Sequence, residues 1–138
     1  MAEDIQDDLT IQDTDGLLRR VPNWPDMVKY DDNLKAYRLS SQCFSDKSTR
    51  DREVSVTLER PLLDGGGKHE DAIATMPDFG LARLEAGFVR HNLDPAQKIR
   101  REPTDDDPHH ALVVGQKNTR AKKDMAKAAK LIIQPKNS

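Results

Sequence analysis

A strand followed closely by a helix near the C-terminus constrains the fold of this chain more than any other feature. Residues 109–115 read His-His-Ala-Leu-Val-Val-Gly, and their unbroken apolar run, rich in β-branched side chains, is typical of a buried strand. Residues 119–131 are rich in alanine and lysine, and their apolar side chains recur every three or four positions opposite a lysine-rich face. That spacing predicts an amphipathic helix. Together the two segments predict a core made of both sheet and helix.

Several shorter strands are predicted along the rest of the chain. The clearest is 53–59, where Val54, Val56 and Leu58 alternate with polar residues, as in a strand with one buried face. A second alternation predicts a strand over 81–90, although a helix is an open alternative there. Further strands are expected at 17–21, 27–30 and 36–39, and short helices at 42–45 and 70–76. These elements predict an α+β fold, a small twisted antiparallel or mixed sheet with the C-terminal helix packed on one face.

Length and composition predict one domain with flexible ends. The chain has 138 residues, of which 36% are hydrophobic and 33% are charged, a low apolar share and a high charged share for a globular domain. Segments that lack apolar side chains cannot offset the conformational entropy lost on ordering. We therefore expect a disordered acidic arm over 1–15, a single α+β domain over 16–133 and a flexible tail over 134–138.

The two ends of the chain carry opposite charge. Residues 1–15 contain six acidic side chains and no basic one, whereas residues 116–138 contain seven basic side chains and one acidic one. Such ends can attract each other, or each can be reserved for a partner of opposite charge.

Composition also excludes several kinds of site. Cys43 is the only cysteine, which rules out an internal disulfide and a zinc site built from several thiolates, and we interpret it as a small buried hydrophobic residue. The glycines before Lys68 lack the spacing of a phosphate-binding loop, so we expect a flexible loop and no cofactor. The chain has no apolar run of about 18 residues, and its start lacks the basic and apolar regions of a secretion signal. We expect no membrane contact and a cytoplasmic location.

The densest set of groups that could carry chemistry is Asp105–Asp107 with His109 and His110. Neighbouring residues on a strand point to opposite faces, so only one of the two histidines can face a given pocket. One histidine packed at the mouth of the strand, beside solvated aspartates, is the favoured interpretation; a general base or a metal ligand is the alternative. Arg38 and Ser41 could hold an anion, or Arg38 could be a paired structural residue. If a histidine met Arg38 and Ser41 in one pocket, a small hydrolase or transferase would be indicated.

The lysine-rich face of the C-terminal helix is a candidate surface for nucleic acid. Four side chains could contact phosphates: Lys122, Lys123, Lys127 and Lys130. Only 4% of the residues are aromatic and no recognised nucleic-acid-binding motif is present, so a solvated helix face is favoured over weak non-specific binding. Trp24, which lies between two prolines, is expected to cover the core rather than to be an exposed binding residue.

Four motifs follow one another along the chain in an order that resembles the order of motifs in other sequences. They are Leu17–Val21, Arg38–Phe44 followed by Glu53–Val56, Gly80–Phe88, and Pro108–Gly115. Their order resembles a group of short bacterial proteins of no assigned function. The resemblance implies a bacterial origin and a shared fold, but no activity and no functional residue. We therefore expect a small accessory or protein-interaction domain in a larger bacterial system, with a protein partner of unknown identity.

Overall fold

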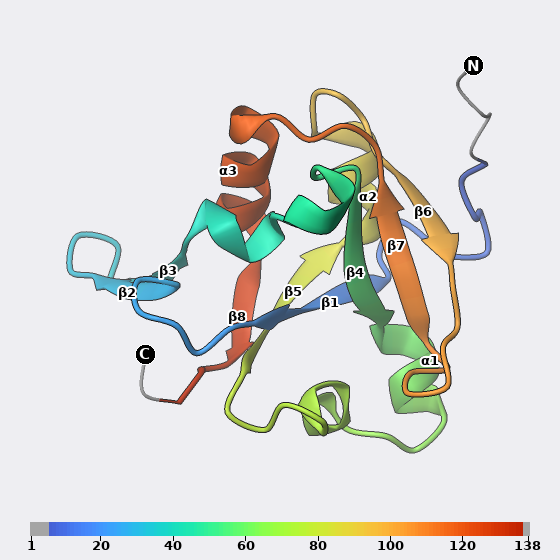
Figure 1. Cartoon of the computed structure of the whole chain (residues 1–138), viewed down its shortest axis with the longest axis horizontal. Coiled ribbons are helices and arrows are strands. Elements are labelled where there is room, and N and C mark those ends of the chain that lie inside the picture. Colours follow the sequence, from blue (N-terminus) through green and yellow to red (C-terminus); the bar gives the residue numbers. More distant parts are fainter. Residues whose placement is uncertain (1–5, 137–138) are drawn as a thin grey trace.

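The protein is built on an antiparallel sheet of six strands, β6-β7-β4-β1-β5-β8, as seen in a computed structural model that describes residues 6–136 (Figure 1). The strands of this sheet are β1 (Gly16–Val21), β4 (Glu53–Leu58), β5 (Gly80–Glu85), β6 (Lys98–Arg101), β7 (His110–Val114) and β8 (Lys130–Ile133). A separate hairpin is formed by β2 (Val28–Asp31) and β3 (Ala36–Leu39). The α-helices are α1 (Glu59–Asp64), α2 (Ala86–His91) and α3 (Thr119–Ala128), and the 3-10 helices are η1 (Ser41–Phe44), η2 (Lys47–Thr49) and η3 (His69–Ile73).

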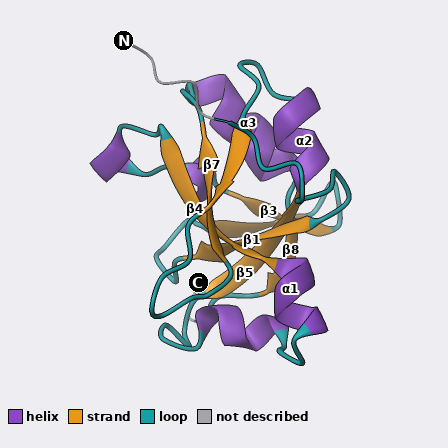
Figure 2. Cartoon of the chain, turned by 90° about the vertical axis from the view of Figure 1, so that its right-hand side faces the viewer, coloured by secondary structure: helices purple, strands orange, loops and turns teal. Residues whose placement is uncertain are grey.

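The sheet buries side chains on both faces. Leu17 belongs to the main core, whereas Leu18, which points to the opposite face, packs in a smaller cluster with Ile73 of η3. Met125 and Ala121 on the apolar stripe of α3 join the main core. Helices α2 and α3 lie at one end of the curved sheet and α1 at the other (Figure 2). The predicted α+β fold with a C-terminal helix on the sheet is confirmed.

Two predicted elements end earlier than expected. The strand over 81–90 stops at Glu85 and continues as α2, because Ala86 and Val89, three positions apart, are both buried on one side of a helix. The C-terminal helix stops at Ala128, and Lys130–Ile133 becomes β8, which pairs antiparallel with β5. The two adjacent isoleucines at the end of this segment favour a strand. Within residues 6–136, no helix is long and apolar enough to cross a bilayer.

The N-terminal segment is docked where the composition predicts disorder. We call residues 7–15 the N-terminal strap. The backbone N–H of Asp8 donates to the carbonyl of Ile99 on β6 at 2.9 Å, and Ile11 is 1% exposed. The expected disordered arm over 1–15 is therefore wrong for the strap, and residues 1–5 lie outside the described residues. One apolar anchor and several ion pairs supply the binding that the low apolar content alone does not predict.

The C-terminal tail is also in contact with the domain as far as it is described. Pro135 is buried, and the backbone N–H of Lys136 donates to the carbonyl of Asp78 at 3.0 Å. The expected flexible tail over 134–138 thus differs from the structure at residues 134–136, while 137–138 lie outside the described residues.

Candidate functional site

The two candidate histidines, His109 and His110, lie at the start of β7. Nδ1 of His110 lies 2.7 Å from the carbonyl oxygen of Glu102, and the carbonyl of His109 accepts a hydrogen bond from the backbone N–H of Leu58 at 2.9 Å. Asp107 accepts from the Thr57 hydroxyl at 2.6 Å and from the His109 backbone N–H at 2.9 Å. These contacts close the turn before β7. They match the structural interpretation of the pair better than a catalytic one.

Arg38 and Ser41 lie in another part of the molecule. Arg38 is on β3, where its Nη1 is 3.3 Å from Oδ2 of Asp31, and Ser41 begins η1. The β2–β3 hairpin and the start of β7 are on opposite sides of the fold (Figure 1). The structure does not bring a histidine together with Arg38 and Ser41, so the arrangement that would indicate a hydrolase or transferase is not formed.

Metal and thiol chemistry find no support in the described part of the chain. Among residues 6–136, no three His, Cys, Asp or Glu side chains are placed to hold a metal ion. Cys43 is buried, and burial raises the pKa of its thiol to about 11. A thiol with that pKa stays protonated at neutral pH, so Cys43 is a packing residue rather than a nucleophile.

The candidate lysines do not form one continuous basic face. Nζ of Lys122 is 2.9 Å from Oδ2 of Asp51, both side chains are mostly buried, and Lys122 is the main cause that lowers the pKa of Asp51 to about 2. Lys130 begins β8 rather than lying on the helix. Lys123 and Lys127 alone remain exposed on α3 among the four. The surface available for phosphates is therefore smaller than the sequence suggests.

Lys117 is a buried cation that the sequence analysis did not single out. Its ammonium donates to four backbone carbonyls, those of Val113 at 2.8 Å, Gly115 at 3.0 Å, and Asp51 and Arg52 at 3.3 Å. Burial lowers the pKa of Lys117 to about 8. The side chain ties the segment before β4 to the end of β7, a structural role. No local pattern could have revealed this role, because two of the four carbonyls belong to Asp51 and Arg52, which are distant from Lys117 in sequence.

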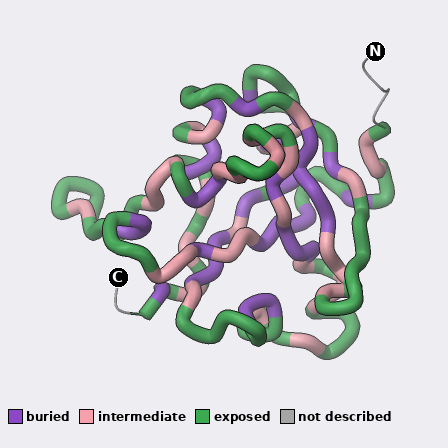
Figure 3. Tube along the Cα trace, viewed as in Figure 1, coloured by how far each residue is buried: buried purple, intermediate pink, exposed green. Residues whose placement is uncertain are grey.

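The β2–β3 hairpin carries an apolar face that the rest of the molecule leaves uncovered. Val28 pairs with Leu39 and Tyr30 with Tyr37, so the four side chains share one face of the hairpin. Val28 is buried and Leu39 packs against the core, whereas Tyr30 and Tyr37 are 54% and 46% exposed. The hairpin is thus buried at its base and exposed towards its turn (Figure 3).

The two tyrosines hold each other in a defined geometry. Their ring centroids are 5.2 Å apart with an interplanar angle of 78°, an edge-to-face contact. The turn of the hairpin is fixed as well, because Oδ1 of Asp31 accepts from the backbone N–H groups of Asn33 and Leu34. The opposite face carries the cross-strand pair Lys29 and Arg38. Lys29 is paired with Asp26 and Arg38 with Asp31, so the hairpin is amphipathic, with one aromatic and one charged face.

Two more apolar side chains near the hairpin are exposed. Leu34 lies in its turn, and Trp24, in the segment that leads into β2, is 58% exposed. The expectation that Trp24 covers the core is wrong, because Met27 and Val28 fill that place and leave the indole outside. We call Trp24, Tyr30, Leu34 and Tyr37 the aromatic patch. The sequence signal for it was available in the pair of tyrosines on two short strands.

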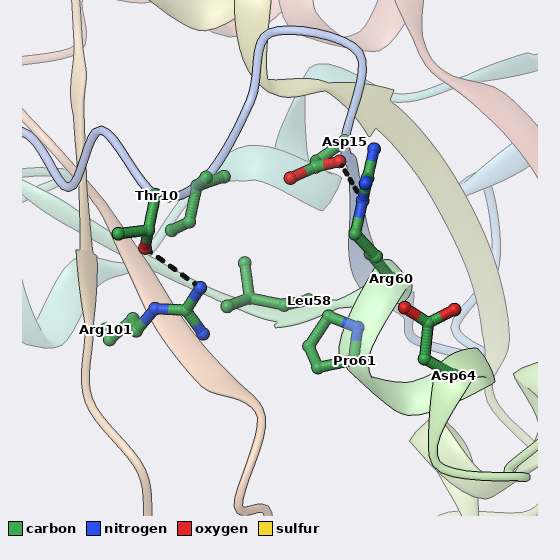
Figure 4. A pocket seen from close by; sticks show the side chains of 8 residues that line it. Thr10, Asp15, Leu58, Arg60, Pro61, Asp64 and Arg101 are labelled. Carbon is green, nitrogen blue, oxygen red and sulfur yellow. Dashed lines mark hydrogen bonds and ion pairs between the residues drawn. The ribbon is translucent and has the colours of Figure 1, made fainter.

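A small cavity lies between the N-terminal strap and α1 (Figure 4). It has a volume of about 140 Å³, and its apolar lining includes Leu58 and Pro61. Arg60 and Arg101 also line it, but they are engaged by Asp15 at 2.6 Å and by the Thr10 hydroxyl at 3.2 Å, respectively. No histidine, cysteine or serine lines this cavity, so it offers no nucleophile or general base of those types.

The geometry thus gives the aromatic patch as the best candidate for a functional surface. Four of the exposed large apolar side chains lie within residues 24–37, and two of them, Tyr30 and Tyr37, are in contact. Exposed apolar patches are typical of interaction sites. Comparison of the chain with known protein families, with curated proteins and with solved structures gave no match.

Proposed function

We propose that this protein is a small accessory domain that binds another protein through the aromatic patch of its β2–β3 hairpin. The observation that carries the proposal is the continuation of one hairpin face from the core into solvent, from buried Val28 to exposed Tyr30 and Tyr37. Tyrosine and tryptophan side chains dominate the energetic centres of protein interfaces.

Preorganisation supports the same function. The edge-to-face contact restricts both tyrosine rings before a partner arrives, and the Asp31 side chain fixes the turn. A rigid hairpin loses little conformational entropy on binding, so more of the contact free energy appears as affinity. The partner that fits is a protein with an apolar recess for the two rings.

The proposed setting is a larger system in the bacterial cytosol. It rests on the resemblance of motifs such as Leu17–Val21 and Pro108–Gly115 to short bacterial proteins, and on the single cysteine, which suits a reducing compartment. Nucleic acid is not proposed as the partner, because Lys122 is engaged by Asp51 and, of the four candidate lysines, only Lys123 and Lys127 are exposed on α3.

Site-specific photo-crosslinking in cells of the source organism tests the proposal. A photoreactive phenylalanine analogue at position 37 places the probe on the aromatic face of the hairpin. The same probe at position 38 places it on the opposite, charged face. We expect a discrete protein adduct from position 37, of stronger yield than any from position 38. Adducts of equal yield at both positions, or none at position 37, would reject the aromatic patch as the contact surface.

A further inference from the structure

The N-terminal strap lies along the outer edge of β6 in the way that a bound peptide lies along a sheet. The backbone N–H of Asp8 donates to the carbonyl of Ile99 at 2.9 Å, and the Asp7 carboxylate accepts from the backbone N–H of Ile99 at 2.9 Å. Both polar groups of this β6 residue are therefore satisfied by the strap. The contact resembles the addition of a segment to an exposed sheet edge at this one residue. The rest of the strap is folded into turns, in which the backbone N–H of Ile11 donates to the carbonyl of Asp8 at 3.1 Å and that of Asp15 donates to the carbonyl of Gln12 at 3.0 Å.

Arg90 of α2 binds the strap through several hydrogen bonds and ion pairs. Its Nε is 2.8 Å from Oδ2 of Asp7, and its Nη2 donates to the carbonyl of Asp8 at 2.9 Å. Its Nη1 donates to the carbonyl of Ile11 at 2.6 Å and to Oδ1 of Asp13 at 3.0 Å. With a side chain only 7% exposed, Arg90 is held in place by the fold and has its donors turned to this segment. A planar, rigid fork of donors gives such contacts directional specificity.

Two further contacts define which residues the groove accepts. Arg101 of β6 holds the Asp8 carboxylate, with Nε 3.0 Å from Oδ2. Three positions later, the Ile11 side chain enters the main core and is 1% exposed, whereas Leu9 between them is 81% exposed. The groove thus recognises two successive acidic residues followed, three positions after the second, by an apolar one.

The strap fills this groove incompletely. The cavity of about 140 Å³ is lined by Thr10 and Ile11 on one side of the strap. A second, open cavity of about 460 Å³ is lined by Asp7, Leu9 and Asp13. A segment that leaves space beside it gains less from dispersion contacts than a close-packed strand does. Its binding combines the contact of Ile11 with the core, backbone hydrogen bonds to Ile99, Ala86 and Gly87, and ion pairs, and salt weakens the ion pairs.

We propose that the groove along β6 and α2 is a recognition site for an acidic segment of a partner protein, and that the strap is its resident ligand. The strap precedes β1 and is not threaded between other strands of the sheet, so it can leave and return without breaking the sheet order. A partner segment with the pattern Asp-Asp-x-x-apolar competes for Arg90, Arg101 and the Ile11 socket. This site is on the side of the fold away from the β2–β3 hairpin and does not depend on the function proposed for it (Figure 1).

Peptide binding to the full chain tests the proposal. The probe is a labelled synthetic peptide of residues 6–15, and the receptor is the full chain carrying Asp7→Asn and Ile11→Ser, which weaken its own strap. We expect saturable one-to-one binding that weakens with salt, and binding at least about tenfold weaker to the unmodified chain, whose groove is filled. A matched peptide with the same two substitutions should also bind at least about tenfold more weakly. No saturable binding to the folded variant, or equal binding of both peptides, would overturn the proposal.

Amide hydrogen exchange of the unmodified chain keeps the test decisive if that variant does not fold. The Asp8 N–H, which is bonded to Ile99, should exchange at least about tenfold more slowly than a free amide but at least about tenfold faster than the N–H of Leu18 in β1. Added salt should accelerate the exchange of Asp8 more than that of Leu18, because ion pairs hold the strap in part, whereas Leu18 lies in the sheet. Equal exchange free energies at the two positions would mean that the strap leaves only with global unfolding, and it would then be a part of the fold rather than a ligand.

Discussion

The β2–β3 hairpin and the N-terminal strap are both peripheral segments, and they meet the rest of the protein in opposite ways. The hairpin has large apolar side chains, including Tyr30 and Tyr37, and leaves them in solvent. The strap is acidic, yet it is docked, because Arg90 and Arg101 receive its carboxylates and the core receives Ile11. The difference shows that complementary surfaces, rather than hydrophobicity, decide whether a segment at the periphery is bound. The strap has found its binding surface within the chain, and the hairpin has not.

The sharpest contrast between the two regions is in their contribution to the free energy of unfolding. Ile11→Ala should destabilise the domain by about 2 kcal/mol. This loss is near the lower end of the range for truncating a buried isoleucine, because the strap can undock instead of leaving a cavity in the core. Tyr30→Ala should lower the free energy of unfolding by no more than about 1 kcal/mol, because it removes the edge-to-face contact with Tyr37 and no core side chain. Urea unfolding of both variants measures the difference. Equal losses would show that the hairpin face is structural.

The Lys122–Asp51 ion pair lies outside both regions and shows how much one mostly buried ion pair contributes to the free energy of unfolding. Lys122→Met should lower the free energy of unfolding by about 1 kcal/mol, since the Lys122–Asp51 pair is mostly buried. Lys123→Met, on the exposed side of α3, should change it by less than about 0.3 kcal/mol.

The same pair has a defined dependence on pH. The folded-state pKa of Asp51 is lowered from 3.8 to about 2, so its contribution is fully present above pH 3.8 and is lost as the pH falls towards 2. The stability gap between the unmodified chain and Lys122→Met should therefore narrow over that interval. Unfolding curves measured at a series of acidic pH values would contradict this assignment if the gap stayed constant.

The smallest predicted effect is on the pKa of the Asp8 carboxyl group in the strap. The hydrogen bond from the Thr10 side chain is the main cause that lowers the pKa of Asp8, with Arg101 adding to it. Strap docking should thus be complete above pH 3.8 and weaken below it. Thr10→Val should move the pKa of Asp8 up towards 3.8, as followed by NMR of its carboxyl carbon. An unchanged titration would show that the arginine, and not the strap itself, sets the charge of Asp8.

The parts of the fold that the sequence predicts well are those whose signals are local. The alternation of Val54, Val56 and Leu58 and the apolar run 111–114 each specify a strand within a few residues, and β4 and β7 lie there. The early ends of the strand at Glu85 and of the helix at Ala128 depend on tertiary contacts, which override weak local preference.

The candidate sites were harder to predict, because they depend on partners that are distant in sequence. Ile11 looks like an isolated apolar residue in an acidic arm until Arg90, 79 positions away, is placed beside its carbonyl. Lys117 looks like one of several basic residues until four carbonyls surround it. Each case needs the position of a distant segment that no local pattern specifies.

The affinity of the partner recovered by crosslinking, measured for two matched variants, tests the central claim most directly. Tyr37→Ser removes a ring from the aromatic patch, and Arg38→Ser changes the adjacent residue on the opposite face of the same strand. We predict that Tyr37→Ser weakens binding by about 30-fold, the effect of an interface hot spot, and that Arg38→Ser weakens it by no more than about threefold. Equal losses for the two variants, or a larger loss for Arg38→Ser, would contradict the assignment of the aromatic face as the contact surface.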